Sequence, residues 1–133
     1  MEQQFPRQIA ALGDVFAFLD GCMAAFQVGE ADAFALRLVV EEFFTNVVKY
    51  SRNGSESILL RVSRRDKQLV VEIVAGSGEP FDVTQAPQVD TMLPLEQRKV
   101  GGLGIHLARN LCDSLEYRYE NGQSIITCTK NLE

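Results

Sequence analysis

The stretch VGGLGIHLARNLC, residues 100–112, decides how this chain of 133 residues is interpreted. Its three glycines are Gly101, Gly102 and Gly104. They open a run, from about Leu103 to Cys112, whose apolar residues recur at helical spacing. Glycines let the free N–H groups of a first helical turn approach an anion closely, and the helix dipole favours negative charge there. The stretch therefore predicts a helix whose start accepts an anion such as a phosphate group.

The segments around this helix predict two hairpins. Residues 57–65 and 68–75, rich in β-branched and aliphatic residues, predict two strands, and residues 114–120 and 124–130 predict the two strands of a final hairpin. Asn121-Gly122 separates the last two strands, and both residues tolerate the positive φ that a two-residue turn demands. Asp66-Lys67 separates the first two strands and suggests a second tight hairpin.

Two more helices and a long loop complete the predicted order. Apolar spacing predicts one helix over residues 8–26 and another from 30 or 31 to 50, whereas residues 1–6 are either a frayed end or a small edge strand. Residues 77–101, interrupted by prolines, predict a lid loop beside the glycine-rich helix. We therefore expect a single domain over residues 1–133, of the α+β class. It is a two-layer α/β sandwich whose mixed, mostly antiparallel sheet is covered on one face by three helices.

The second helix places a carboxylate and an amide side by side. Its core-facing stripe consists of Leu36, Val39, Val40, Phe43, Phe44 and Val47. Glu42 and Asn46 are four residues apart and stack at the edge of this stripe. Glu41 lies about 100° away, with Arg37 and Thr45, on the side where solvent is expected.

This pair has two interpretations. In one, Glu42 acts on a ligand as a general base or water orienter, and Asn46 supplies an oxygen ligand for Mg²⁺. In the other, both are boundary polar residues that pair with Lys49 or solvent, because a carboxylate and an amide often share helical spacing by accident. The helix alone leaves both interpretations open.

The composition excludes several functions. A net charge of −5 argues against binding to nucleic acid or an anionic membrane, because both need a basic surface. The sequence contains neither a charged-then-apolar leader nor an apolar run of about 20 residues. Three cysteines without CxxC spacing are expected to be reduced, buried thiols of a cytoplasmic protein: Cys22, Cys112 and Cys128.

Three segments in this order carry a family resemblance. EEFFTNVVKYS, SGEPFD and GGLGIHLARNLCDSLEY resemble the motifs of the ATPase superfamily of gyrase, the heat-shock chaperone and the sensor histidine kinases. Within that superfamily the chain looks most like the small anti-sigma-factor serine kinases, from about residue 8 to residue 130. The resemblance implies a Bergerat-type ATP-binding fold with ATP and Mg²⁺ as cofactors.

The resemblance also implies roles for individual residues. Glu42 matches the catalytic base, Asn46 the magnesium ligand, and Lys49 a phosphate contact. The positions that match nucleotide-binding residues of the family are Asn46, Lys49, Ser77, Gly78, Gly101, Gly102, Leu103 and Gly104.

One position departs from the family pattern. Gly76 stands where the family has an aspartate that accepts a hydrogen bond from the adenine amino group. A hydrogen bond to a charged group contributes about 1.5–3 kcal/mol, which corresponds to roughly a ten- to hundredfold effect on affinity. The departure predicts that ATP binding is weakened, relaxed in its choice of base, or lost.

Three functions follow as expectations. The first is an ATP-dependent serine/threonine kinase that switches between a small antagonist protein and a sigma factor. The second is a protein-interaction module of the same fold with impaired nucleotide binding, which sequesters a regulatory partner. The third, ranked last, is a detached ATP-binding domain of a histidine kinase. Kinases of this type are often dimers, so the resemblance allows a homodimer, whereas neither nucleic acid nor a membrane is expected as a partner.

Overall fold

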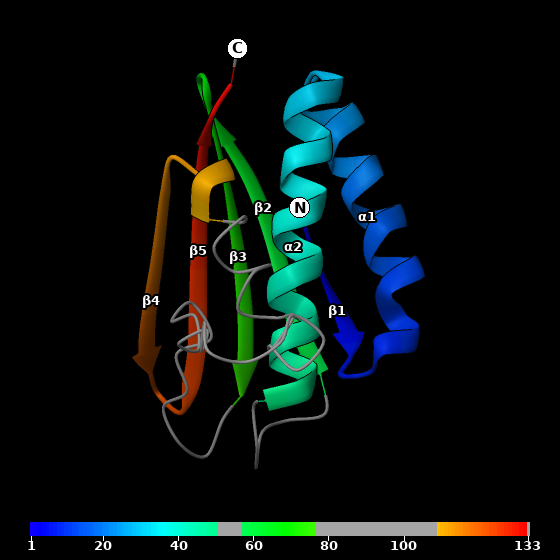
Figure 1. The fold of residues 1–133 in the computed structure, drawn as a ribbon, viewed down its shortest axis with the longest axis vertical. Coiled ribbons are helices and arrows are strands. Elements are labelled where there is room, and N and C mark those ends of the chain that lie inside the picture. Colours follow the sequence, from blue (N-terminus) through cyan, green and yellow to red (C-terminus); the bar gives the residue numbers. More distant parts are fainter. Residues whose placement is uncertain (51–56, 77–108, 133) are drawn as a thin grey trace, which may run out of the picture.

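Five strands form one antiparallel sheet, and two long helices cover one of its faces (Figure 1). The computed structural model describes residues 1–50, 57–76 and 109–132. The helical elements are the short 3-10 helix η1 (Ile9–Ala11), α1 (Leu12–Ala25) and α2 (Glu30–Tyr50). The strands are β1 (Glu2–Pro6), β2 (Ser57–Arg65), β3 (Gln68–Gly76), β4 (Ser114–Glu120) and β5 (Gln123–Asn131). This arrangement confirms the predicted α+β class.

The N-terminal residues form an edge strand, which decides between the two alternatives left by the sequence. The strand order is β1-β2-β3-β5-β4, so β1 and β4 are the outer strands. The Cα position of Phe5 pairs with that of Ile58, and the Phe5 ring is buried in the core. Met1 and Val62 extend the pairing, because each backbone nitrogen donates to the other's carbonyl, at 2.8 and 2.7 Å.

Both predicted hairpin turns are present. Arg65 pairs with Gln68 across a two-residue turn, in which Asp66 has a φ of 55°. At the other hairpin, Asn121 and Gly122 have φ values of 51° and 74°. Positive φ at both central residues matches the right-handed twist of the flanking strands, which is why Asn-Gly is favoured there.

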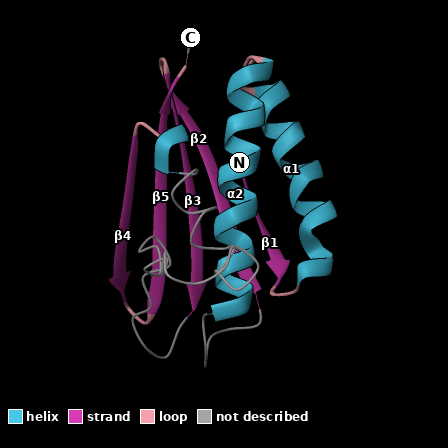
Figure 2. Cartoon of the chain, in the orientation of Figure 1, coloured by secondary structure: helices cyan, strands magenta, loops and turns pink. Residues whose placement is uncertain are grey.

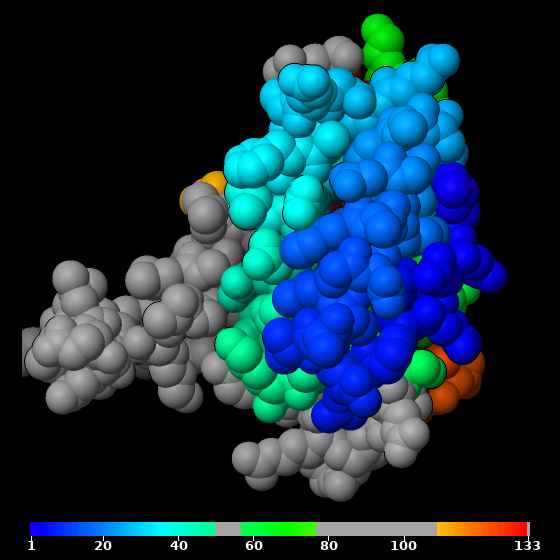
Figure 3. All heavy atoms as spheres, turned by 90° about the vertical axis from the view of Figure 1, so that its right-hand side faces the viewer, coloured from blue at the N-terminus to red at the C-terminus, as the bar shows by residue number. Residues whose placement is uncertain are grey.

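The predicted core stripe of α2 is confirmed. All six of its residues are at most 3% exposed: Leu36, Val39, Val40, Phe43, Phe44 and Val47. Helix α1 lies beside α2, as the space-filling view in Figure 3 shows. The guanidinium of Arg37 stacks over the ring of Phe16 on α1, at 4.2 Å from the ring centroid.

Two details of the helices differ from the sequence-based expectation. Glu41 and Thr45, expected in solvent, are half-buried because they follow Arg37 along the side of α2 that faces α1. Ile9, within the first predicted helix at 8–26, is 44% exposed. It lies on the 3-10 turn that precedes α1, where the α-helical spacing does not apply. Within the described residues, neither α1 nor α2 combines the length and apolar character needed to cross a bilayer.

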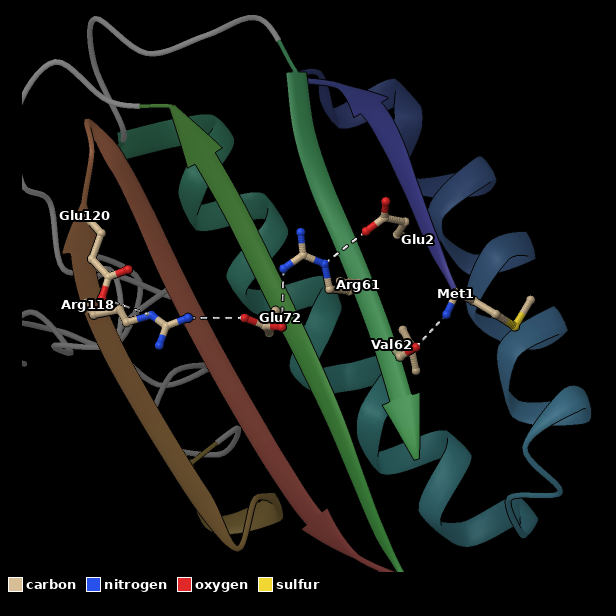
Figure 4. A network of polar contacts seen from close by, with 7 residues as sticks. All are labelled: Met1, Glu2, Arg61, Val62, Glu72, Arg118 and Glu120. Atoms are coloured by element: carbon tan, nitrogen blue, oxygen red, sulfur yellow. Dashed lines mark hydrogen bonds and ion pairs between the residues drawn. The ribbon is translucent and has the colours of Figure 1, made fainter. Parts of the chain in front are cut away.

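The sheet has one buried face and one open face. Alternate residues of β3 pack into the core under the helices, namely Leu69, Val71, Ile73 and Ala75. The intervening residue Glu72 lies on the open face, shown in Figure 4 with the helices behind the sheet. Arg61 and Arg118 approach its carboxylate at 3.5 Å from opposite sides. A row of alternating charge therefore crosses the sheet on the side away from α2.

Candidate functional site

Asn46 and Glu42 form a hydrogen-bonded pair in the C-terminal half of α2. The Nδ2 atom of Asn46 donates to Glu42 Oε1 at 2.9 Å and to the Glu42 backbone carbonyl at 2.8 Å. Asn46 is only 2% exposed, although its neighbours along the helix, Phe43, Phe44 and Val47, form the apolar core. An amide buried among such residues is held in one orientation by its hydrogen bonds. The pair is therefore a fixed polar element within a hydrophobic surrounding.

The environment of Glu42 changes its affinity for a proton. Burial raises the pKa of the Glu42 carboxyl above its ordinary value, and the negative charge of Glu41 acts in the same direction. The hydrogen bond from Asn46 and the positive charge of Lys49 oppose this rise in pKa but do not cancel it. A carboxylate with a raised pKa accepts a proton more readily near neutral pH, which suits a general base.

The contacts of this pair bear on both of its interpretations. The side chain of Lys49 is exposed, so this residue acts on Glu42 through its charge. Asn46 bonds Glu42 directly and is nearly inaccessible to solvent. The remaining group of the amide, its oxygen, is the type of ligand that Mg²⁺ prefers.

The other predicted binding residues lie outside the described part of the chain. They are Ser77, Gly78, Gly101, Gly102, Leu103 and Gly104, together with the predicted lid at 77–101. Of the predicted glycine-rich helix, residues 109–111 are described and are helical. Within the described residues, no three histidine, cysteine or acidic side chains gather to hold a metal ion.

Gly76 is the last residue of β3 and pairs with Gln123 of β5. Helix α2 and strand β3 end on the same side of the molecule, at the bottom of Figure 1. The alternation of β3, however, places Ala75 on the helix-covered face and residue 76 on the face of Glu72. With this alternation, residue 76, at which the family has an aspartate, lies on the face of the sheet away from Glu42.

Sequence reasoning missed the contacts that hold the end of the third helix. The ammonium of Lys130, on β5, donates to the Leu111 carbonyl at 3.0 Å and lies 3.9 Å from a carboxylate oxygen of Asp32 on α2. One side chain thus joins β5, α2 and the helical residues 109–111. A cation at a helix C-terminus is favourable, but Lys130 and Leu111 are 19 positions apart, so the sequence contains no local signal of this contact.

Comparison with known proteins supports the fold. The family profile described as "Histidine kinase-like ATPase domain" matches residues 5–130. The serine/threonine-protein kinase BtrW of Bordetella bronchiseptica is 25% identical over 99 residues, which cover 74% of this chain and 70% of the relative. The serine-protein kinase RsbW of Listeria monocytogenes is 29% identical over 96 residues, which cover 68% and 61%. A serine-protein kinase RsbW from Halalkalibacterium halodurans is 24% identical, and the match covers 100% of this chain and 83% of that relative.

Solved structures share the fold at lower identity. A chain of Mycobacterium tuberculosis with RsbU and RsbW domains superposes with a TM-score of 0.69 at 17% identity, with 99% of this chain and 31% of that chain covered. The SiaB–SiaC complex of Pseudomonas aeruginosa gives a TM-score of 0.58 at 13% identity, with 98% and 88% covered. This protein spans 61% of the length of the Listeria relative. Because the family profile covers almost all of its residues, the chain belongs to the histidine kinase-like ATPase domain family.

Proposed function

We propose that this protein binds ATP with Mg²⁺ and acts as a regulatory serine/threonine kinase of the anti-sigma-factor type on a small antagonist protein. The hydrogen-bonded pair of Glu42 and Asn46 is the observation that carries the proposal. The pair occupies the positions of catalytic base and magnesium ligand in the family motif. The kinases BtrW and RsbW among the relatives support the same activity.

Each residue of the site would have a separate role in the reaction. Glu42 would take the proton from a serine or threonine hydroxyl, and its raised pKa favours that transfer. Asn46 would hold the metal ion through its amide oxygen while its nitrogen keeps the Glu42 carboxylate in place. A bound Mg²⁺ neutralises charge on the phosphate groups. Lys49, exposed near the end of the same helix, would contact a phosphate, as would the N–H groups of Gly102 and Gly104.

A second function is favoured by Gly76. This residue offers no side-chain acceptor for the adenine amino group, and β3 places it on the face away from α2. A protein that keeps the fold but binds nucleotide weakly would regulate by holding a protein partner, such as an antagonist or a sigma factor. In that case Glu42 and Asn46 would contribute to the structure of α2 rather than to a reaction.

A calorimetric titration separates the two functions. Wild-type protein is titrated with ATP, ADP and GTP, each with and without Mg²⁺. The kinase proposal expects saturable binding of ATP that strengthens with Mg²⁺, and loss of this metal dependence in Asn46→Ala. Absence of heat at millimolar nucleotide would end the proposal and favour the interaction module.

Thr45→Ala is the matched control for this titration. Thr45 neighbours Asn46 but donates its hydroxyl to the Glu42 carbonyl within its own helix, at 3.0 Å. Removal of that bond perturbs α2 slightly and leaves the Glu42 carboxylate and the Asn46 amide in place. A metal dependence that disappears equally in both variants would indicate a general disturbance of α2 instead of a lost ligand.

A further inference from the structure

Two of the three thiols meet at the end of the third helix. The Sγ atoms of Cys112 and Cys128 lie 2.7 Å apart, although the residues are 16 positions apart in the sequence. Cys112 directly follows the helical residues 109–111, and Cys128 lies on β5. Both cysteines are free thiols. Since a disulfide bond is ~2.05 Å long, the sulfur atoms need to approach by roughly 0.6 Å to form one.

The backbone around both thiols is already held in this arrangement. The amide of Asp113 donates to the Thr129 carbonyl at 2.9 Å. The amide of Asn131 donates to an Asp113 carboxylate oxygen at 2.5 Å. Lys130 adds its bond to the Leu111 carbonyl from the same strand. Figure 2 shows the short helical segment lying against β5. Bond formation between the thiols therefore requires little ordering of the chain beyond what the fold supplies.

The two thiols differ in accessibility and acidity. Cys112 is half-buried, whereas Cys128 is 3% exposed. The hydrogen bond from the Cys128 thiol lowers the pKa of Cys112, and the Lys130 ammonium lowers it further, against the opposing effects of burial and Asp113. The same hydrogen bond, together with burial, raises the pKa of Cys128. Cys112 is therefore the thiolate that meets a reagent first, and Cys128 is the thiol placed to react second.

We propose that Cys112 and Cys128 form a reversible intramolecular disulfide when the protein meets an oxidant of the peroxide class. The Cys112 thiolate attacks one oxygen of hydrogen peroxide, the O–O bond breaks, and a sulfenic acid and hydroxide result. The Cys128 sulfur then attacks the Cys112 sulfur, the S–S bond forms, and the S–O bond breaks with release of water. Two thiols lose two electrons and two protons in total, and one peroxide becomes two water molecules.

The disulfide would join the end of the third helix covalently to β5. Leu111 and Cys112 pack against the hydrophobic core, so this end of the helix is part of the folded structure. A cross-link across about 15 residues restricts the unfolded chain, and we expect the melting temperature to rise by roughly 10 °C in the oxidised protein. This inference does not depend on whether the protein uses ATP.

The test uses the reduced full chain treated with a small excess of hydrogen peroxide. We expect the number of titratable thiols to fall from three to one, and peptide mapping to show Cys112 linked to Cys128. A dithiol reductant should restore all three thiols and the lower melting temperature. Cys22 is fully buried in a different part of the core, and Cys22→Ala should leave the reaction unchanged.

Two further variants test the order of the two oxidation steps. In Cys128→Ser, we expect the sulfenic acid at Cys112 to persist and to be trapped by dimedone. In Cys112→Ser, which changes the more exposed position, we expect both remaining thiols to stay reduced. The proposal is overturned by sulfinic acid at Cys112 of the wild type without a linked peptide, by no loss of thiols, or by a link that includes Cys22 or joins two chains.

Discussion

Asn46 Nδ2 bridges two oxygen atoms of Glu42, the side-chain Oε1 at 2.9 Å and the backbone carbonyl at 2.8 Å. This contact ties the carboxylate of Glu42 to the helix that carries it, among residues of the hydrophobic core. A carboxylate oriented in this way is ready to accept a proton without first losing side-chain freedom. The relationship motivates the first two predictions.

Glu42→Gln should abolish phosphoryl transfer while it preserves the fold and nucleotide binding. The amide of glutamine has the size of the carboxylate and still accepts a hydrogen bond from Asn46, but it takes up no proton. Loss of a general base lowers the rate by about 10²–10⁴-fold. The measurement is ADP formation from Mg-ATP in the presence of candidate antagonist proteins. Glu41→Gln, one residue away on the side facing α1, is the control and should retain the wild-type rate. Equal rates in both variants would remove Glu42 from the catalytic role.

The raised pKa of Glu42 predicts a pH-dependent stability. The folded state binds the carboxyl proton more tightly than the unfolded state, whose pKa is near 4.5, so the free energy of unfolding falls as pH rises from 4.5 through the folded pKa. Glu42→Gln removes this group. Its melting temperature relative to wild type should therefore be higher at pH 7 than at pH 4.5. Thermal denaturation at both values checks this, with Glu41→Gln as the reference. If the difference in melting temperature between Glu42→Gln and wild type is the same at both pH values, burial of the ionised Glu42 carboxylate costs no free energy of unfolding.

Gly76→Asp tests the position that departs from the family pattern. A carboxylate that reached the adenine amino group would increase ATP affinity roughly ten- to hundredfold over GTP. Because β3 places residue 76 on the face of Glu72, we expect ATP affinity to change by less than threefold. Titration of the variant with ATP and GTP gives the answer. A gain of tenfold or more, selective for ATP, would show that residue 76 faces the nucleotide and that the motif alignment outweighs the strand register.

Glu72→Gln should have a small effect on stability and none on nucleotide binding. Its carboxylate lies between Arg61 and Arg118 at 3.5 Å, but both arginine side chains are about half exposed, at 46% and 54%. Ion pairs in such surroundings contribute about 0.2–1 kcal/mol and are screened by salt. Urea denaturation at low and high salt should show a loss in this range that shrinks at high salt. Glu120→Gln, at the exposed end of the same row, should show no loss. If Glu72→Gln changes the nucleotide affinity, the nucleotide site lies on the open face of the sheet, and its placement beside α2 is contradicted.

Local patterns in the sequence were sufficient for most elements of the fold. The bounds of β2 and β4 agree with the expected 57–65 and 114–120, and Asn121-Gly122 forms the expected turn. Between α1 and α2 the chain contains Gly29, but the residue with positive φ is Gln27, at 56°. The Val28 amide donates to the Met23 carbonyl at 2.9 Å. This hydrogen bond closes the C-terminal end of α1 about one turn before Gly29.

Half of the candidate site was also accessible to sequence reasoning. Glu42 and Asn46 are adjacent because four residues of any α-helix bring two side chains together, and the structure confirms their contact. Whether the chain around Gly76 faces that pair depends on the pairing of β3 with its neighbours. A shift of one residue in a strand moves every side chain to the opposite face, so the motif alone did not determine it.

The sequence by itself determined the two long helices, the hairpins and the family of this protein, because hydrophobic periodicity and turn chemistry act between residues close together in the chain. Only the tertiary structure decided that residues 2–6 pair with β2, that Lys130 holds the end of the third helix, and that the thiols of Cys112 and Cys128 meet. These contacts join residues that are 16 to 59 positions apart, as in the pairing of Glu2 with Arg61. They form because burial of the shared core brings distant elements together, and no local pattern records which side chains then become neighbours.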